Sequence, residues 1–222
     1  LAFVLLFTVI NLGVKEQKKP VTSYTILPDA NGKRSFSLKT TDTPIMLNID
    51  IKGVIGVDSL TAERIRFILQ CSREGVFNNK NGVNRVKGIL LHIKSPGGSA
   101  MDTNAIYNSL LQYREKYNVP IYAYIDGICA SGGMYIACVA DRIIANDIGL
   151  VGSVGVILPS FLNFSDAMNK VGLSSITISA GKEKDAMNPL RPWKENEDES
   201  YKDLVDFYYK DFVNVVTKSR PN

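Results

Sequence analysis

The chain has 222 residues, of which 45% are apolar and 22% are charged, and its formal net charge is +4. This length and apolar content are typical of one globular α/β domain with a sizeable core, which argues against disorder over most of the chain. The positive charge is spread along the sequence rather than gathered in basic runs interleaved with aromatic residues. A nucleic-acid partner is therefore not expected.

The first ten residues, LAFVLLFTVI, are almost entirely apolar and are followed by the charged stretch KEQKK. A bilayer-spanning helix needs about 20 apolar residues, so this run is too short to cross a membrane by itself. It is typical of the end of a transmembrane or signal segment. We expect residues 1–14 to be a truncated anchor of this kind and residues 15–44 to be a linker. A buried core segment is the alternative for the apolar run.

From residue 45 onward, predicted strands alternate with predicted helices. The strands show β-rich or continuous apolar patterns, and the helices show apolar residues at intervals of three or four. Strands are expected at 45–55, 86–93, 120–126, 142–145, 153–157 and 174–179. Helices are expected at 59–74, with Ser59 as a cap, at 101–117, with Ile106, Leu110 and Tyr113 on one face, and at 131–140, 165–171 and 201–218. This alternation predicts an α/β fold with a largely parallel sheet.

The cysteines do not form a metal-binding pattern. Cys71, Cys129 and Cys138 lack CxxC spacing, and the chain has a single histidine. A zinc site would need ligands that no spacing supplies. We interpret the cysteines as structural thiols and expect neither a metal nor a cofactor.

Two glycine-rich loops follow neighbouring predicted strands. They are SPGG at 95–98 and GICASGG at 127–133. The carboxyl ends of parallel strands commonly build the functional site. Ser131, at the start of a helix and before two glycines, lies where free N–H groups favour negative charge, as acyl transfer requires. Taken separately, the glycines fit simple turns and the serine fits a helix cap.

A serine nucleophile needs a base, and the sequence offers two kinds. His92 lies inside a predicted strand, where a histidine on the sheet face or in the core is the simpler interpretation. Lys182 and Lys184 follow the strand at 174–179, and a Ser–Lys pair is a known variant of serine catalysis. The amine of such a lysine must lose its proton, which burial favours. A solvated surface charge is the alternative for either lysine.

Four motifs, in this order along the chain, resemble the S49 family of serine peptidases, of the signal peptide peptidase A type. They are HIKSPGGS, YIDGICASGGMYIACVADRIIA, GLVGSVGVI and SAGKEKDAMNP. The resemblance implies a Clp/crotonase-like fold of repeated β-β-α and βα units, with a largely parallel sheet flanked by helices. It also implies a catalytic domain over residues 45–222 whose C-terminal part is missing.

The resemblance assigns roles to individual residues. Ser131 corresponds to the nucleophile and Lys184 to the general base. Lys182 lies two positions before the place of the family's lysine. Ser153 corresponds to the serine that hydrogen-bonds the lysine amine. The N–H groups of Gly98 and Gly132 correspond to the oxyanion donors.

The resemblance further implies a serine endopeptidase that hydrolyses remnant signal peptides, or other membrane-associated peptides, through an acyl-enzyme. It implies a homo-oligomeric ring whose adjacent subunits share each site. The expected location is the bacterial cytoplasmic membrane, with a single N-terminal anchor and an extracytoplasmic catalytic domain. Lysines at 15, 18 and 19 would by charge alone favour the opposite topology.

One departure from the family and two alternatives accompany this prediction. Lys94 stands where many members have Asn, which concerns substrate contacts rather than the chemistry. A catalytically silent scaffold or binding protein of the same fold is the first alternative. A crotonase-like acyl-CoA enzyme is the second, although a Ser–Lys pair at these positions does not suit it.

Overall fold

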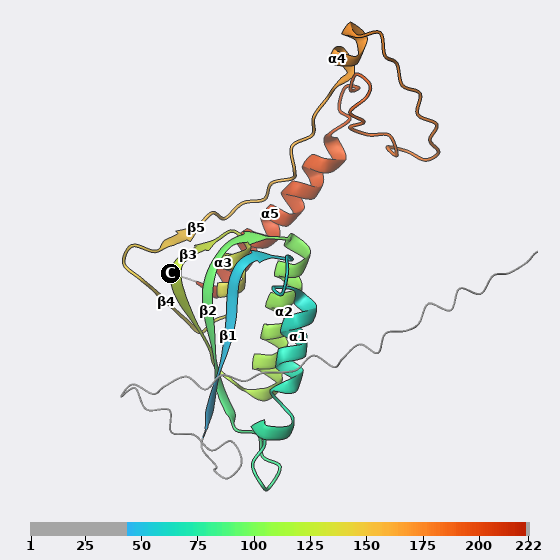
Figure 1. Ribbon diagram of the computed structural model, residues 1–222. Helices are drawn as coiled ribbons and strands as arrows, with labels where there is room; N and C mark the ends of the chain where they lie inside the picture. The colour runs from blue at the N-terminus through green and yellow to red at the C-terminus, as the bar shows by residue number, and fades with distance from the viewer. Residues whose placement is uncertain (1–43, 221–222) are drawn as a thin grey trace, which may run out of the picture. The chain divides into compact units, whose positions relative to one another are not determined.

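The computed structural model describes residues 44–220 (Figure 1). The predicted anchor, residues 1–14, and nearly all of the predicted linker lie outside this range. Between residues 44 and 220, no helix has the length and apolar character needed to cross a bilayer.

The centre of the fold is a parallel sheet. Its strands are β1 (Ile45–Ile55), β2 (Val86–Gly98), β3 (Ile121–Ala130), β4 (Arg142–Ala145) and β5 (Leu150–Gly152). The order is β1-β2-β3-β4, and β5 pairs with the last residues of β3. Every pairing in this sheet is parallel, which confirms the predicted α/β class.

One face of the sheet forms the core, because alternate residues of a strand point to the same side. The core side chains of the three long strands include Ile49, Ile51, Ile89, Leu91, Ile93, Ile121, Ala123 and Ile125. The helices that cover this face are α1 (Ala62–Cys71), α2 (Ala100–Tyr117) and α3 (Gly132–Ala137) (Figure 1). The buried residues of α2 include Ile106, Leu110 and Tyr113, which confirms the predicted apolar face.

The opposite face of the sheet carries polar side chains, with His92 among them. Its Nε2 atom lies 3.3 Å from Oδ2 of Asp126, and its Nδ1 atom lies 3.5 Å from Oδ1 of Asp50. These carboxylates come from the strands on either side, so the histidine links three strands. The interpretation of His92 as a sheet-face histidine is confirmed.

Several helix boundaries differ from the predicted ones. The cap of α1 is Thr61 rather than Ser59, because the Thr61 side chain accepts a hydrogen bond from the N–H of Arg64. The predicted helix at 131–140 is shorter, since α3 ends at Ala137. The remaining helices, α4 (Ser165–Lys170) and α5 (Glu199–Ser219), lie close to their predicted ranges.

The strands predicted at 153–157 and 174–179 are wrong for this chain. β5 ends at Gly152, and neither segment is paired with another strand of residues 44–220. Their isoleucines are solvated, with 89% of Ile157, 90% of Ile176 and 96% of Ile178 exposed. Alternating side chains favour an extended segment, but a strand also needs a neighbour that pairs its N–H and C=O groups.

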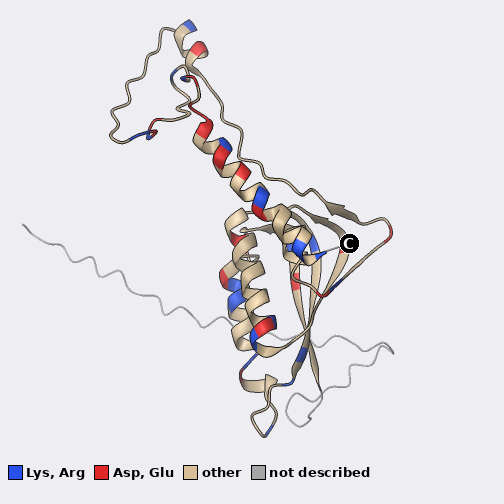
Figure 2. Ribbon diagram, turned by 180° about the vertical axis from the view of Figure 1, so that it is seen from behind, with Lys and Arg blue, Asp and Glu red and all other residues tan. Residues whose placement is uncertain are grey.

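Residues 153–198, here called the arm, leave the sheet after β5, run beside the N-terminal half of α5 and end at the start of that helix (Figure 1). The C-terminal half of α5 packs on the main body, where Phe212 is buried and Nη2 of Arg220 donates to the carbonyl of Ala140 at 2.9 Å. In Figure 2, the ribbon along the projecting half of α5 is coloured red and blue at acidic and basic residues. Two ion pairs there join residues four positions apart, which suits a solvated helix.

Candidate active site

Ser131 has a backbone conformation that is rare for a residue with a side chain. It lies between β3 and α3 with φ 50° and ψ −123°. These angles belong to the first central residue of a type II′ turn, a position that glycine normally occupies. A non-glycine residue in such a region costs about 1–3 kcal/mol, and strain of this kind gathers at functional sites.

The surrounding backbone holds Ser131 in this conformation. Its N–H donates to the carbonyl of Gly152 at the end of β5, at 2.9 Å, and its carbonyl accepts from the N–H of Tyr135 at 3.0 Å. Although Ser131 occupies the N-cap position of α3, its side chain makes no capping hydrogen bond. The interpretation of Ser131 as a helix cap is therefore wrong, and the half-buried hydroxyl is not committed to the helix.

The two glycine-rich loops lie against each other, as their positions after neighbouring strands predict. A Cβ atom on Gly97 would lie 2.7 Å from Cβ of Ser131 and 3.0 Å from the nitrogen of Gly132. The backbone of Gly97 also has a φ of 106°, so only glycine suits this position. Nothing in the sequence distinguished Gly97 from Gly98, because both fit a tight turn.

The serine of SPGG, Ser95, stabilises its loop through hydrogen bonds of its side chain. The Ser95 hydroxyl is buried, donates to the carbonyl of Gly53 at 2.7 Å and accepts from the N–H of Gly97 at 3.1 Å. Gly98 packs on β1, where a Cβ atom would lie 2.2 Å from the carbonyl oxygen of Ile55. This packing fixes the end of β2 beside Ser131.

The other predicted oxyanion donor, the N–H of Gly132, is the first N–H of α3 and has no intrahelical acceptor. A Cβ atom on Gly132 would lie 2.4 Å from Oγ1 of Thr103, so the helix approaches α2 closely here. The roles of Gly98 and Gly132 as oxyanion donors stay predictions.

Of the two residues predicted to act together with Ser131, the base Lys184 and its supporting Ser153, only Ser153 lies near it. Ser153 directly follows Gly152, the residue that accepts from the N–H of Ser131, and is exposed with φ 55°. Lys184 is exposed in the arm, and the arm segment that carries it lies beyond the N-terminal end of α5, away from α3 (Figure 1). One chain therefore brings the glycine loops and Ser153 to Ser131, but not Lys184.

The arm loop that carries Lys184 is organised by Arg191. The Nε atom of Arg191 donates to Oδ2 of Asp185 at 2.5 Å, and its Nη1 atom donates to Oε2 of Glu197 at 3.0 Å. Further contacts join Nη2 of Arg191 to Glu197 Oε1 and to the Asp185 carbonyl. The guanidinium thus links the carboxylate of Asp185 to that of Glu197 and holds the two ends of the loop together.

We expect acid to open this loop. Hydrogen bonds from Arg191 are the main cause that lowers the pKa of Glu197 from its ordinary 4.5 to about 2, and they also lower the pKa of Asp185. Because these pKa values lie below those of the unfolded chain, the stabilisation is present above about pH 4.5 and is lost as the pH falls toward 2.

Trp193, the single tryptophan of the chain, reports on the loop because its Nε1–H donates to the carbonyl of Asn188. Its fluorescence emission should move to longer wavelength within this acidic range. In the Glu197→Gln variant, the acidic transition should shrink. An emission maximum that does not change between neutral pH and about pH 2 would contradict the prediction.

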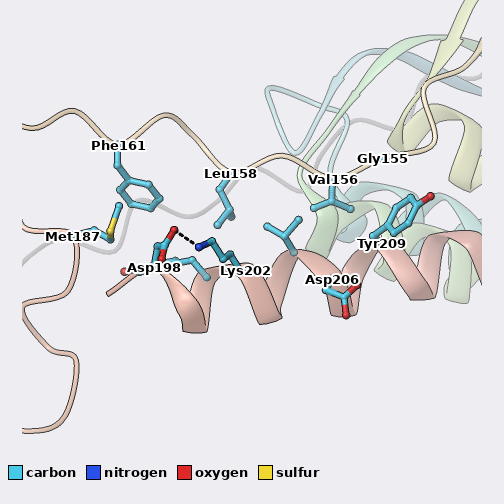
Figure 3. A pocket seen from close by; sticks show the side chains of 11 residues that line it. Gly155, Val156, Leu158, Phe161, Met187, Asp198, Lys202, Asp206 and Tyr209 are labelled. Atoms are coloured by element: carbon cyan, nitrogen blue, oxygen red, sulfur yellow. Dashed lines mark ion pairs between the residues drawn. The ribbon is translucent and has the colours of Figure 1, made fainter. Parts of the chain in front are cut away.

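A groove of about 600 Å³ lies between the arm and α5 (Figure 3). Its walls are mostly apolar, and its polar rim includes the ion pair between Asp198 and Lys202. The apolar side chains that line it are Val156, Leu158, Phe161, Met187 and Val205, with the rings of Tyr201 and Tyr209. The arm therefore exposes apolar surface in this groove as well as at residues 153–157 and 174–179.

The cysteines and the acidic residues offer no metal site in the described range. Cys71, Cys129 and Cys138 are free thiols, and the last two are buried. Burial is the main cause that raises the pKa of Cys129 to about 12, so this thiol stays protonated. Over residues 44–220, no group of three His, Cys, Asp or Glu side chains is placed to hold a metal ion.

The fold and the site define this protein as an α/β protein that presents a strained serine at a strand-to-helix turn, flanked by a second glycine loop. Residues 114–221 match the model of peptidase family S49. This is the family that the four motifs resemble, and the matched range includes three of them.

The chain is also similar to curated proteins whose names describe peptidases. The chain is 38% identical over 135 residues to "Putative signal peptide peptidase SppA" of Enterococcus faecium, covering 61% of this chain and 39% of that protein. It is 30% identical over 137 residues to "Serine protease SPPA, chloroplastic" of Arabidopsis thaliana, covering 61% of this chain and 20% of that protein. The chain thus spans well under half the length of these relatives. Among solved structures it is similar to a ClpP1 mutant from Listeria monocytogenes, with a TM-score of 0.30, 18% identity, and coverage of 42% of this chain and 46% of that one.

Proposed function

We propose that this chain is part of a serine peptidase in which Ser131 is the nucleophile. The observation that carries the proposal is the conformation of Ser131, which is held in a glycine-like turn by the Gly152 carbonyl with no capping role for its hydroxyl. Backbone strain of this kind gathers at functional sites, where the surrounding structure holds it in place. The match of residues 114–221 to the model of peptidase family S49 supports the same conclusion.

In the proposed reaction, Oγ of Ser131 attacks the carbonyl carbon of a peptide bond while the neutral amine of Lys184 accepts the hydroxyl proton. The N–H groups of Gly98 and Gly132 stabilise the negative charge on the former carbonyl oxygen. The C–N bond then breaks, the protonated lysine returns the proton to the leaving amine, and an ester on Ser131 remains. Water, deprotonated by the same lysine, hydrolyses the ester.

We propose that Lys184 acts on the Ser131 of a second copy of the chain. Lys184 is exposed on the arm, and a surface that covered its amine would favour the neutral form that a base needs. The arm also exposes Ile157, Ile176 and Ile178 on segments that lack a strand partner within residues 44–220. A neighbouring copy would cover these residues and pair these segments. A head-to-tail contact of this kind closes naturally into a ring.

The proposed substrates are remnant signal peptides or other membrane-associated peptides, at the bacterial cytoplasmic membrane and with the catalytic domain outside the cytoplasm. The names of the similar proteins support the substrate class, since one is called a signal peptide peptidase. The apolar run at residues 1–10 supports a membrane location.

The direct test is labelling with a fluorophosphonate, which reacts with activated serines. We expect one covalent adduct per chain, on Ser131 when the peptides are sequenced by mass spectrometry, and no adduct when Ser131 is replaced by Ala. An absence of labelling in the assembled protein would favour the catalytically silent scaffold. Tight binding of coenzyme A without labelling would favour the crotonase-like alternative.

A further inference from the structure

The phenol of Tyr135 is hydrogen-bonded to residues of two other helices, α2 and α5. It belongs to α3, is 6% exposed, and donates from its hydroxyl to Oδ2 of Asp211 in α5 at 2.7 Å. The same hydroxyl accepts from Nδ2 of Asn104 in α2 at 2.9 Å. Its ring packs against Tyr107 and Phe212, with ring centroids 5.2 Å away in each case.

Tyr135 is also one helical turn from the proposed nucleophile. Its N–H donates to the carbonyl of Ser131 at 3.0 Å, so the first turn of α3 joins the two residues. A six-residue helix has little stability of its own, and its orientation is set by what packs on it. A displacement of the phenol would therefore move the backbone that holds Ser131 in its strained conformation.

Asp211 connects this turn to the arm. α5 is a single helix of 21 residues; its C-terminal half contacts α3 through Asp211 and Phe212, and its N-terminal end is where the arm returns. Burial is the main cause that raises the pKa of Tyr135, so the phenol keeps its proton and remains a donor to the carboxylate. The helix that borders the lysine-bearing arm is thus hydrogen-bonded to the helix that begins at the serine.

We infer that Tyr135 and Asp211 are positioning residues. Their hydrogen bond holds the Ser131 turn in its reactive conformation and joins it to the C-terminal half of α5. The inference rests on the proposed function. Neither residue touches the reacting atoms in this scheme. Their effect passes through the first turn of α3.

The test compares four single variants and one double variant by the rate at which a fluorophosphonate labels Ser131 and by kcat and KM on a peptide. Tyr135→Phe keeps the ring contacts but removes the hydroxyl, and Asp211→Ala removes the acceptor. Each should lower the labelling rate and kcat by roughly ten- to hundredfold with little change in KM, because small displacements of a reacting group have effects of this size.

Two further variants separate positioning from general damage to the fold. Asp211→Asn keeps an acceptor oxygen and should retain most of the rate. Asp203→Ala, which removes an exposed carboxylate from the same helix, should behave as the wild type. The Tyr135→Phe and Asp211→Ala changes combined should be no worse than either alone, since both break one interaction.

Hydrogen exchange of the segment 128–136 measures the same coupling without any need for activity. We expect faster exchange in Tyr135→Phe and Asp211→Ala, and wild-type exchange in Asp203→Ala. Unchanged exchange or an unchanged labelling rate in Tyr135→Phe would overturn the inference. If the wild-type protein is not labelled at all, the proposed function fails, and hydrogen exchange still decides whether the Tyr135–Asp211 contact orders the serine turn.

Discussion

Replacing Ser131 with Ala should lower peptide hydrolysis by about 10⁴-fold or more, the size of loss seen when a catalytic serine is removed. The free energy of unfolding should change by less than about 0.5 kcal/mol, because the hydroxyl makes no capping hydrogen bond and alanine tolerates the local backbone no worse than serine. Turnover of a fluorogenic peptide and urea unfolding measure the two effects. A variant that kept a substantial part of wild-type turnover would show that another group is the nucleophile.

Ser131→Gly is the matched control for strain. Glycine adopts φ 50° with ψ −123° readily, so this variant should be as inactive as Ser131→Ala. It should also be more stable than the wild type by about 1 kcal/mol, the lower end of the cost of such a conformation. A gain in stability with a loss of activity would show that the fold keeps the strain for function. A glycine variant less stable than the alanine variant would contradict that view.

The second large effect concerns the lysine. Lys184→Ala should be as inactive as Ser131→Ala, because residues that act as a unit fail together. Lys182→Ala should retain most activity, since its side chain is 92% exposed and its ion pair is with the neighbouring Glu183. The same peptide assay compares the two variants. The opposite result would move the base by two residues.

Mixing the two inactive proteins tests whether sites are shared between copies. Under conditions that allow subunit exchange, Ser131→Ala and Lys184→Ala chains in equal amounts should recover activity, since roughly a quarter of head-to-tail contacts would join an intact serine to an intact lysine. Mass spectrometry of differently labelled chains serves as the control for exchange. If exchange occurs and the mixture stays inactive, serine and lysine act within one chain, and the arm must then fold back onto its own sheet.

The predictions from sequence were most accurate where burial and periodicity agree. β1, β2 and β3 place their alternate apolar residues in one core, and α2 buries the residues that its helical spacing indicated. Prediction failed at 153–157 and 174–179, where the alternating pattern was present but no neighbouring strand within residues 44–220 pairs with the segment. Alternation is a property of a few consecutive residues, whereas pairing needs a second segment at the right place.

The sequence by itself determined the alternation of strands and helices, the pair of glycine loops and the placing of a serine at the start of a helix. These features depend on neighbouring residues, so the order of side chains is enough to indicate them. Only the tertiary structure decided that Ser131 is strained rather than a cap, that Gly97 lies against it, and that Tyr135 meets Asp211, 76 positions further along the chain. Contacts between distant segments depend on how strands and helices pack, and no local pattern encodes which side chains then meet.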